Sequence, residues 1–324
     1  MHLINGQQVR ELLPMQRCIE LMEHALRLVT DQRTRQPLRS WLQPPGVAGV
    51  MALMPGYLPE PAALGVKVIS VFAGNFARGL PSHQGAVMLF DAAHGEPLAL
   101  IDARAVTAIR TAAASAVATR LLAAADARTL GLCGYGEQAA SHLEALSLVR
   151  PFERILVWGR DHAKCRAFAE QHSGDLDIAI EPVDSAQAAA SADVICTLTS
   201  SSQPVVLGRW LRPGQHLNLV GASLPHAAEV DAEALVRARY FVDFRDSALA
   251  FAGELRLARE AGLIAESHLL GSLGEVLQGT LTGRGAPEDL TIFKSLGMIA
   301  EDLVACDFVL REAQRLGVGE HVHW

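Results

Sequence analysis

The sequence predicts an α/β protein that combines a doubly wound parallel sheet with a smaller α+β domain. Residues 129–243 alternate short apolar runs with helical patterns, as parallel strands alternate with their crossover helices. A glycine-containing turn, Gly134-Tyr135-Gly136, follows the first of these runs. The first hundred residues instead show a helical pattern followed by short extended runs, which indicates a second sheet.

In the first part, the apolar spacing of Ile19, Met22, Leu26 and Val29 predicts an amphipathic helix over 14–33. Extended runs follow at 50–54, 64–72, 85–90 and 97–101, and a turn at 92–97 joins the last two as a hairpin. An Ala-rich helix is predicted over 103–125. A last amphipathic helix, over 297–316, is expected to return to the first domain.

The parallel sheet is predicted from six runs, at 129–133, 154–158, 178–182, 193–197, 216–220 and 239–243. Helices are expected at 137–149 and 161–172, with short ones at 254–262 and 273–279. The predicted domains are therefore 1–118 with 305–324, and 119–304.

The turn after the first run continues as Glu137-Gln138-Ala139, which completes G-x-G-x-x-A between a strand and a helix. This is the fingerprint of Rossmann-type dinucleotide-binding domains. Gly134 permits a tight turn, Gly136 lets a pyrophosphate approach the backbone, and Ala139 lets the helix pack closely. The helix N-terminus offers N–H groups and a positive dipole end to the phosphates.

The tip of the next predicted strand reads Gly159-Arg160-Asp161. NAD-specific sites usually place an acidic residue there for the ribose 2′-hydroxyl, whereas a guanidinium suits a 2′-phosphate. We therefore predict a preference for NADP(H), with NAD(H) as the alternative. Arg160 could instead be a solvated loop residue and Asp161 an N-cap; we expect Asp161 to cap the next helix and Arg160 to bind phosphate.

Composition excludes several partners. The 324 residues are 50% hydrophobic with a net charge of −7, which argues against nucleic acid or an anionic membrane. No apolar signal core or membrane-length run is present. The five cysteines lack C-x-x-C spacing, which predicts reduced thiols and a cytoplasmic location. The 12 histidines show no metal-binding pattern, so no metal is expected; His321 and His323 suggest a frayed tail.

Three basic residues lie in apolar contexts of the first domain: Lys67, Arg110 and, less clearly, Arg39. Buried cations are costly unless they are paired, and no acidic residue is near them in the sequence. Either a distant carboxylate forms a structural ion pair, or an anionic substrate binds there. For Lys67 and Arg110 we favour a substrate carboxylate; context alone leaves Arg39 open.

The chain resembles the ornithine cyclodeaminase/μ-crystallin family. The resemblance covers nearly the whole chain and is carried by six runs in order: 65–67 (GVK), 81–84 (PSHQ), 109–113 (IRTAA), 133–138 (CGYGEQ), 219–223 (LVGAS) and 293–297 (FKSLG). It implies a Rossmann domain beside a substrate domain that also forms a homodimer. The family includes ornithine cyclodeaminases, ketimine reductases, certain alanine dehydrogenases and opine-type synthases.

The resemblance also implies roles by position. Arg39, Lys67 and Arg110 match the substrate-carboxylate binders. The residues matched to the cofactor or to closure of its cleft are Ser82, Thr111, Glu137, Gln138, Thr197, Val220, Gly221, Ala222, Ser223, Ser295 and Leu296. Of these, Ser82 and Thr111 fall beside the nicotinamide, and Glu137 and Gln138 supply amides to the pyrophosphate. Leu296 is also expected to contact substrate. Thr197 and Ser82 could instead satisfy local backbone groups.

One departure from the family pattern separates its branches. Cyclodeaminases carry a catalytic aspartate two residues before the proline that is here Pro225, where this chain has Ser223. A second acidic residue of that branch appears as Ala52. Cyclodeamination needs a positioned carboxylate to exchange protons with an amine, which serine cannot replace. Glu229 and Asp231 are close by, but they resemble the start of the next helix.

We therefore expect NADPH-dependent reduction of an α-imino acid to the L-amino acid. The substrate would be a cyclic ketimine such as Δ1-pyrroline-2-carboxylate or Δ1-piperideine-2-carboxylate, because an iminium needs little acid–base help. His83 is the candidate proton donor, with a structural histidine as the alternative. Other readings are an amino-acid dehydrogenase of alanine or opine type, a reductase of a linear imino acid such as iminoarginine, ornithine cyclodeaminase, or an NADP-binding μ-crystallin-like protein.

Overall fold

The computed structural model describes residues 1–176 and 178–323. Its contacts divide the chain into two compact units: Met1–Thr111 with Gly297–Trp324, and Ala112–Leu296. One unit contains a mixed sheet and the other an all-parallel sheet, so the predicted α/β class is confirmed. The predicted domain boundaries at 118/119 and 304/305 stay a prediction.

The first unit is built on a seven-stranded sheet in the order β15-β1-β6-β5-β4-β3-β2. Its strands are β1 (His2–Ile4), β2 (Ser40–Leu42), β3 (Val50–Pro59), β4 (Ala62–Val71), β5 (His83–Phe90), β6 (Pro97–Asp102) and β15 (Glu320–His321). Only the β1–β6 pair is parallel. The four longer strands were predicted, as was the hairpin between β5 and β6. The three short strands were not, because two or three residues show no periodicity.

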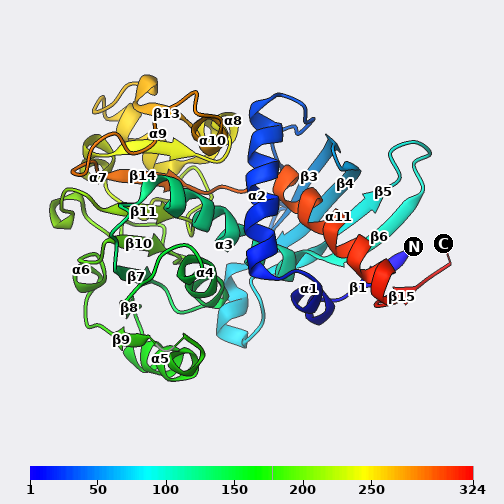
Figure 1. The fold of residues 1–324 in the computed structure, drawn as a ribbon, viewed down its shortest axis with the longest axis horizontal. Coiled ribbons are helices and arrows are strands. Elements are labelled where there is room, and N and C mark those ends of the chain that lie inside the picture. The colour runs from blue at the N-terminus through cyan, green and yellow to red at the C-terminus, as the bar shows by residue number, and fades with distance from the viewer. Residues whose placement is uncertain (177, 324) are drawn as a thin grey trace. The chain divides into compact units, whose positions relative to one another are not determined.

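Helices cover one face of this sheet. They are α1 (Gly6–Leu12), α2 (Met15–Thr30) and α11 (Ile299–Leu316). Helix α11 packs against α2 and against β3, β4 and β5, and Figure 1 shows it in red beside α2 and in front of the sheet. The last helix therefore returns to the first domain, as expected. Helix α1 was missed; Asn5 caps it with a capping box.

The two faces of this sheet differ. Met54, Lys67, Val87 and Ile101 are neighbours across β3 to β6 and all are buried. Because side chains alternate along a strand, the next row points the other way. That row is part of an apolar surface, here called the outer sheet face, whose members are at least partly exposed: Pro55, Tyr57, Leu64, Val66, Met88, Phe90 and Leu100.

The second unit contains eight parallel strands in the order β13-β12-β14-β11-β10-β7-β8-β9. They are β7 (Thr129–Cys133), β8 (Arg154–Trp158), β9 (Ala179–Pro182), β10 (Val194–Thr197), β11 (His216–Leu219), β12 (Arg239–Val242), β13 (Leu269–Ser272) and β14 (Thr291–Lys294). The run β9-β8-β7-β10-β11 is the 3-2-1-4-5 order of a Rossmann sheet, which reverses between β7 and β10. Six strands were predicted; β13 and β14, four residues each, were not.

The helices of this unit are the C-terminal half of α3 (Ala103–Leu122), α4 (Glu137–Ser147), α5 (His162–Leu176), α6 (Ala186–Ala189), α7 (Ala232–Arg237), α8 (Arg245–Phe251), α9 (Gly253–Glu260) and α10 (Leu273–Gln278). Helix α3 ends before the predicted residue 125. The Arg150 and Arg284 guanidinium groups donate to its last carbonyls, including that of Leu122, and so satisfy groups that a longer helix would bond internally.

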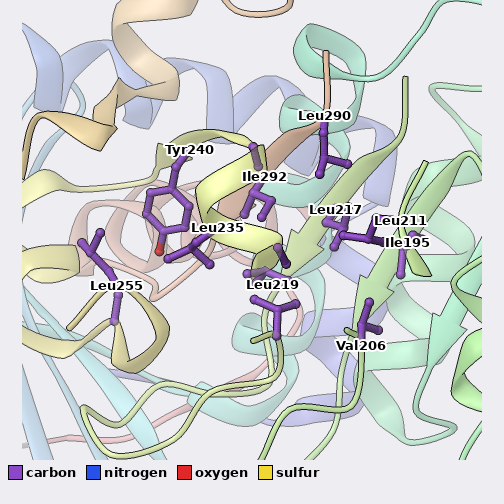
Figure 2. Packing of buried hydrophobic residues seen from close by; sticks show 14 of the residues in the cluster. Ile195, Val206, Leu211, Leu217, Leu219, Leu235, Tyr240, Leu255, Leu290 and Ile292 are labelled. Atoms are coloured by element: carbon purple, nitrogen blue, oxygen red, sulfur yellow. The ribbon is translucent and has the colours of Figure 1, made fainter. Parts of the chain in front are cut away.

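An apolar core of this unit lies on one side of the sheet's central strands. Ile195, Leu217 and Ile292 come from the neighbouring strands β10, β11 and β14, and they pack with Leu235 of α7 and Leu255 of α9. Figure 2 shows these side chains in a row that runs from Leu255 to Ile195. Such a continuous apolar strand surface is typical of a parallel sheet covered on both faces.

Two smaller predictions have different outcomes. All five cysteines are free and buried, as expected. The frayed tail is wrong at His321, because β15 pairs antiparallel with β1 and the Val322 N–H donates to the Met1 carbonyl at 2.9 Å. None of the described helices is long and apolar enough to cross a membrane.

Candidate active site

Lys67 lies on the helix-covered face of β4 and is only 1% exposed. Its Nζ donates to Oδ1 of Asp302 at 2.8 Å and to Oγ1 of Thr107 at 2.6 Å. Burial is the largest influence and lowers the pKa of Lys67 to about 8; the charge of Asp302 raises it, and that of Arg110 lowers it. The ammonium of Lys67 therefore loses its proton at a lower pH than that of an exposed lysine.

Arg110, in the first half of α3, contacts the same acidic pair. Its Nε donates to Asp302 Oδ1 at 3.1 Å and its Nη1 to Glu301 Oε2 at 2.9 Å. Burial alone would raise the pKa of Asp302, but the charges of Arg110 and Lys67 outweigh it and leave this pKa below its ordinary value. The distant ion pair that the sequence left open is thus present.

Sequence reasoning missed Glu301 and Asp302. They lie 191 or more residues from Arg110 in the chain, so proximity could not reveal them. The available signal was their position: two adjacent acids on the apolar side of a helix, flanked by the buried residues Ile299, Ala300 and Leu303. Buried carboxylates need partners, and the only unexplained cations of the first domain were Lys67, Arg110 and Arg39.

Arg39 joins this group through Gly297. Its Nη2 donates to the Gly297 carbonyl at 2.9 Å, and its guanidinium lies 5.8 Å from the centre of the Trp41 ring. A Cβ atom at Gly297 would lie 2.7 Å from Arg110 Nη1, so both arginines approach this glycine. The group formed by Arg39, Lys67, Arg110, Glu301 and Asp302, here called the cation cluster, has three positive and two negative charges. The cluster is therefore rich in cationic hydrogen-bond donors, which suit an anion.

Three other predicted residues of this unit lie on different elements. Ser82 Oγ is 2.9 Å from Nδ1 of His83 at the start of β5. Ser82 therefore contacts a side chain rather than the local backbone group that was its alternative. His83 is exposed, and Thr111 is buried beside Arg110 on α3. Their roles stay predictions.

In the second unit, the glycine turn has the expected geometry. Gly134 has a φ of +132°, and a Cβ there would meet the Leu198 carbonyl oxygen at 2.8 Å. Gly136 precedes α4, and a Cβ there would have no heavy atom within 4 Å. Open space therefore lies over Gly136, where a phosphate would approach the N-terminal amides of Glu137 and Gln138. Ala139 is fully buried, as close helix packing requires.

A buried carboxylate, Glu229, fastens the loops at the carboxyl ends of β10 and β11. Its Oε2 accepts from Thr197 Oγ1 at 2.9 Å and from the N–H groups of Gly221 and Ala222 at 2.7 and 3.1 Å. Its Oε1 accepts from both the N–H and the hydroxyl of Thr199, at 2.9 and 2.7 Å. Thr197 thus binds a side chain rather than a local backbone group.

The prediction that Glu229 belongs to the next helix is wrong. Helix α7 begins at Ala232, and only Asp231 serves it, accepting from the Ala234 N–H as N-cap. Glu229 precedes this cap and is 1% exposed. The sequence could not show this role, because the groups that donate to the Glu229 carboxylate lie in two other loops. Gly221 permits the approach: a Cβ there would lie 2.1 Å from the Thr199 carbonyl oxygen.

A second missed group lies at the end of β14. Lys294 is fully buried, pairs with Glu254 at 3.2 Å and donates to the Ala222 carbonyl. Next to it, the Ser295 hydroxyl is buried without a hydrogen-bond partner among the described residues, and the Leu296 N–H donates to Asp243 at 2.6 Å. A buried hydroxyl with no protein partner fits a site that a bound cofactor completes.

The residues expected to select the cofactor lie at the end of β8. The Asp161 carboxylate accepts from the N–H groups of Ala163 and Lys164 at 3.0 and 3.2 Å, so it caps α5 as predicted. Arg160 is exposed, and its role toward a 2′-phosphate stays a prediction. Within residues 1–176 and 178–323, no three His, Cys, Asp or Glu side chains are placed to hold a metal.

A Rossmann strand order, with an open glycine turn ahead of a helix N-terminus, defines an α/β protein of the dinucleotide-binding class. The chain matches the ornithine cyclodeaminase/mu-crystallin family over residues 2–316 and belongs to that family. It is 36% identical over 279 residues to the ketimine reductase mu-crystallin of Mus musculus, covering 86% of this chain and 85% of the relative. The predicted family is thereby confirmed.

Solved structures are similar over the full length. The Δ1-pyrroline-2-carboxylate reductase of Thermococcus litoralis, in complex with NADH and L-proline, superposes with a TM-score of 0.97 at 35% identity, covering 99% of this chain and 100% of that one. An archaeal alanine dehydrogenase dimer with bound NAD gives a TM-score of 0.94 at 29% identity, covering 100% and 99%.

Proposed function

We propose that the protein reduces a cyclic α-imino acid to the L-amino acid with a hydride from a reduced nicotinamide cofactor. The observation that carries this proposal is the cation cluster, in which Arg39, Lys67 and Arg110 lie together and Lys67 keeps one N–H group with no partner among the described residues. An imino-acid carboxylate would accept a hydrogen bond from that N–H group. The similar reductases from Thermococcus litoralis and mouse support the same reaction class.

In this mechanism the chain mainly binds and orients. Arg110 and Arg39 offer guanidinium forks that match a carboxylate, and Lys67 adds a point charge. The bound cofactor supplies the hydride. A protonated imine accepts that hydride without a strong acid from the protein, so fixed orientation accounts for much of the rate. We keep His83 as the candidate for a polar contact to the substrate nitrogen.

Ornithine cyclodeamination fits the residues poorly. Ser223 replaces the aspartate of the cyclodeaminases, and a hydroxyl cannot exchange protons with an amine at neutral pH. Glu229 is the nearest acid in sequence, but five donors occupy its two oxygens. A carboxylate held in this way is not available as a base.

We further propose NADPH as the preferred cofactor, with NADH as the alternative. Arg160 lies at the end of β8, where an acidic residue would favour the ribose hydroxyl of NADH. The matched residues that would hold the dinucleotide are Ser82, Thr111, Gly134, Gly136, Glu137, Gln138, Arg160, Thr197, Val220, Gly221, Ala222, Ser223 and Ser295. The similar structures contain NADH or NAD, so the phosphate preference rests on Arg160 alone.

The second candidate is an amino-acid dehydrogenase, which forms the imine itself from a 2-oxo acid and ammonia. The likeness to the archaeal alanine dehydrogenase favours it, and the cation cluster would hold a 2-oxo acid equally well. A panel of cyclic imino acids, pyruvate with ammonia, and L-ornithine separates the candidates. If the protein reduces only the cyclic imino acids, the imino-acid reductase is supported. If it turns over pyruvate with ammonia but none of the cyclic imino acids, the imino-acid reductase is overturned.

We also propose a homodimer formed through the outer sheet face. Leu64 and Leu100 on this face are 38% and 37% exposed, and a contiguous exposed apolar surface is typical of a protein–protein contact. The occupant we propose is a second copy of the chain, in keeping with the similar archaeal dimer. The free buried cysteines support a reducing, cytoplasmic location.

Light scattering tests the dimer. We expect twice the 34.7 kDa chain mass for the native protein and a monomer for the double variant Val66→Asp/Leu100→Asp. Leu148→Asp, at an exposed leucine of the other unit, is the control. A native monomer, or a double variant that remains dimeric, contradicts this proposal.

A further inference from the structure

We infer that Asp302 is a positioning residue, which keeps Lys67 cationic and aims Lys67 and Arg110 together at the substrate carboxylate. This inference rests on the proposed function, because it concerns how the same site binds its substrate. Asp302 itself is fully buried within α11 and need not touch the substrate.

The geometry places both cations on one oxygen. Lys67 Nζ and Arg110 Nε reach Asp302 Oδ1 at 2.8 and 3.1 Å, while Oδ2 has no hydrogen-bond partner among the described residues. An acid that served only to neutralise two cations would gain more by using both oxygens. Sharing one atom instead brings the two cationic groups close together, as a single carboxylate ligand requires.

Lys67 retains a donor for that ligand. An ammonium has three N–H groups, and the structure assigns two of them, to Asp302 and Thr107. The strand neighbours of Lys67, Met54 and Val87, are apolar. The third N–H therefore has no partner in the described part of the chain, and a substrate oxygen would satisfy it.

The charge of Lys67 depends on few groups. Those that face it are Asp302 and Cys306 from α11 and Arg110 from α3. Burial lowers the pKa of Lys67 to about 8, the negative charge of Asp302 raises it, and Arg110 lowers it. Without the Asp302 charge, burial and Arg110 would act with less opposition, and Lys67 would lose its proton at a lower pH.

The test is the pH dependence of kcat/KM for Δ1-pyrroline-2-carboxylate in the native protein and in Asp302→Asn. Binding requires the Lys67 cation, so kcat/KM should fall as the pH rises through its pKa. In Asp302→Asn we expect this alkaline limb to move down by about one pH unit or more, with a raised KM. The ionisation of the substrate is common to both proteins and cancels in the comparison.

Asp307→Asn is the matched control, since Asp307 lies on the same helix and pairs with Arg311 at 3.0 Å rather than with the cluster. The alkaline limb of its kcat/KM profile should coincide with that of the native protein. If the alkaline limb of folded Asp302→Asn also stays at the native pH, the inference is overturned.

If Asp302→Asn fails to fold, Lys67→Arg tests whether the Lys67 charge sets the alkaline limb, because a guanidinium stays charged. The limb should then move up to the value set by substrate ionisation alone, and a limb that coincides with that of the native protein overturns the inference. A native protein that reduces no imino acid would instead contradict the proposed function, so the two failures are distinguishable.

Discussion

Gly297 and Arg110 are so close that a single methyl group would not fit between them. A Cβ atom at Gly297 would lie 2.7 Å from Nη1 and 2.8 Å from Nη2 of Arg110. The backbone φ at Gly297 is +76°, a region that favours glycine. This glycine also accepts a hydrogen bond from Arg39, so it fixes how two cations of the cluster approach each other.

The first prediction concerns this glycine. Gly297→Ala should displace the Arg110 guanidinium and lower kcat/KM by at least about tenfold, roughly 1.4 kcal/mol. Gly46→Ala is the control, because Gly46 has a similar φ of +75° but no heavy atom near its Cβ position. In Gly46→Ala the strained backbone should lower the Tm, but kcat/KM should stay near the native value. Equal activity in the two variants would contradict the assignment.

The second prediction tests the carboxylate-binding role of Arg110. Arg110→Lys keeps the charge beside Glu301 and Asp302 but loses the guanidinium fork. We expect kcat/KM to fall about 100-fold, close to 3 kcal/mol, with a smaller change in Tm than in Arg110→Ala, which leaves two buried carboxylates under-compensated. Near-native kcat/KM in folded Arg110→Lys would show that the fork does not bind substrate.

The third prediction concerns Glu229. Glu229→Gln replaces one acceptor oxygen with an NH2 group that would face N–H donors of Thr199, or of Gly221 and Ala222. We expect the Kd for the reduced cofactor to rise at least about tenfold, measured by fluorescence titration. Glu233→Gln, at a half-exposed position in the first turn of α7, should leave the Kd unchanged. An unchanged Kd in Glu229→Gln would show that this carboxylate does not contribute to cofactor binding.

The fourth prediction concerns cofactor choice. The native protein should have a higher kcat/KM with NADPH than with NADH, and Arg160→Asp should reverse this preference by removing the cation and adding an acid. Lys164→Asp makes the same change of charge one turn away in α5 and should leave the ratio as it is. If the native protein uses both cofactors equally well, Arg160 does not bind a 2′-phosphate.

Local features were predictable from the sequence, and pairings between distant segments were not. The strand, glycine turn and helix at 129–147 follow one another in the chain. The sequence pattern of each element therefore supports the prediction of the next one. The donors to Glu229 and the acids that hold Lys67 and Arg110 come from separate elements. No periodicity predicts which segments meet, and strands as short as β14 leave little pattern to read.

The cation cluster shows this division clearly. The sequence indicated that Lys67 and Arg110 needed negative partners, because each lies in an apolar element. It could not show that Asp302 bonds both through one oxygen, since α11 follows Lys67 by 235 residues at that contact. The acids in the chain and the proposed substrate carboxylate therefore contact the same cations.

The most direct test compares two reactions of one purified preparation. With Δ1-pyrroline-2-carboxylate and NADPH, we expect consumption of NADPH and formation of L-proline in equal amounts. With L-ornithine and NAD, we expect no ammonia above background, because Ser223 cannot replace a carboxylate and the oxygens of Glu229 are occupied by five donors. Release of ammonia from ornithine, without reduction of the imino acid, would contradict the central claim.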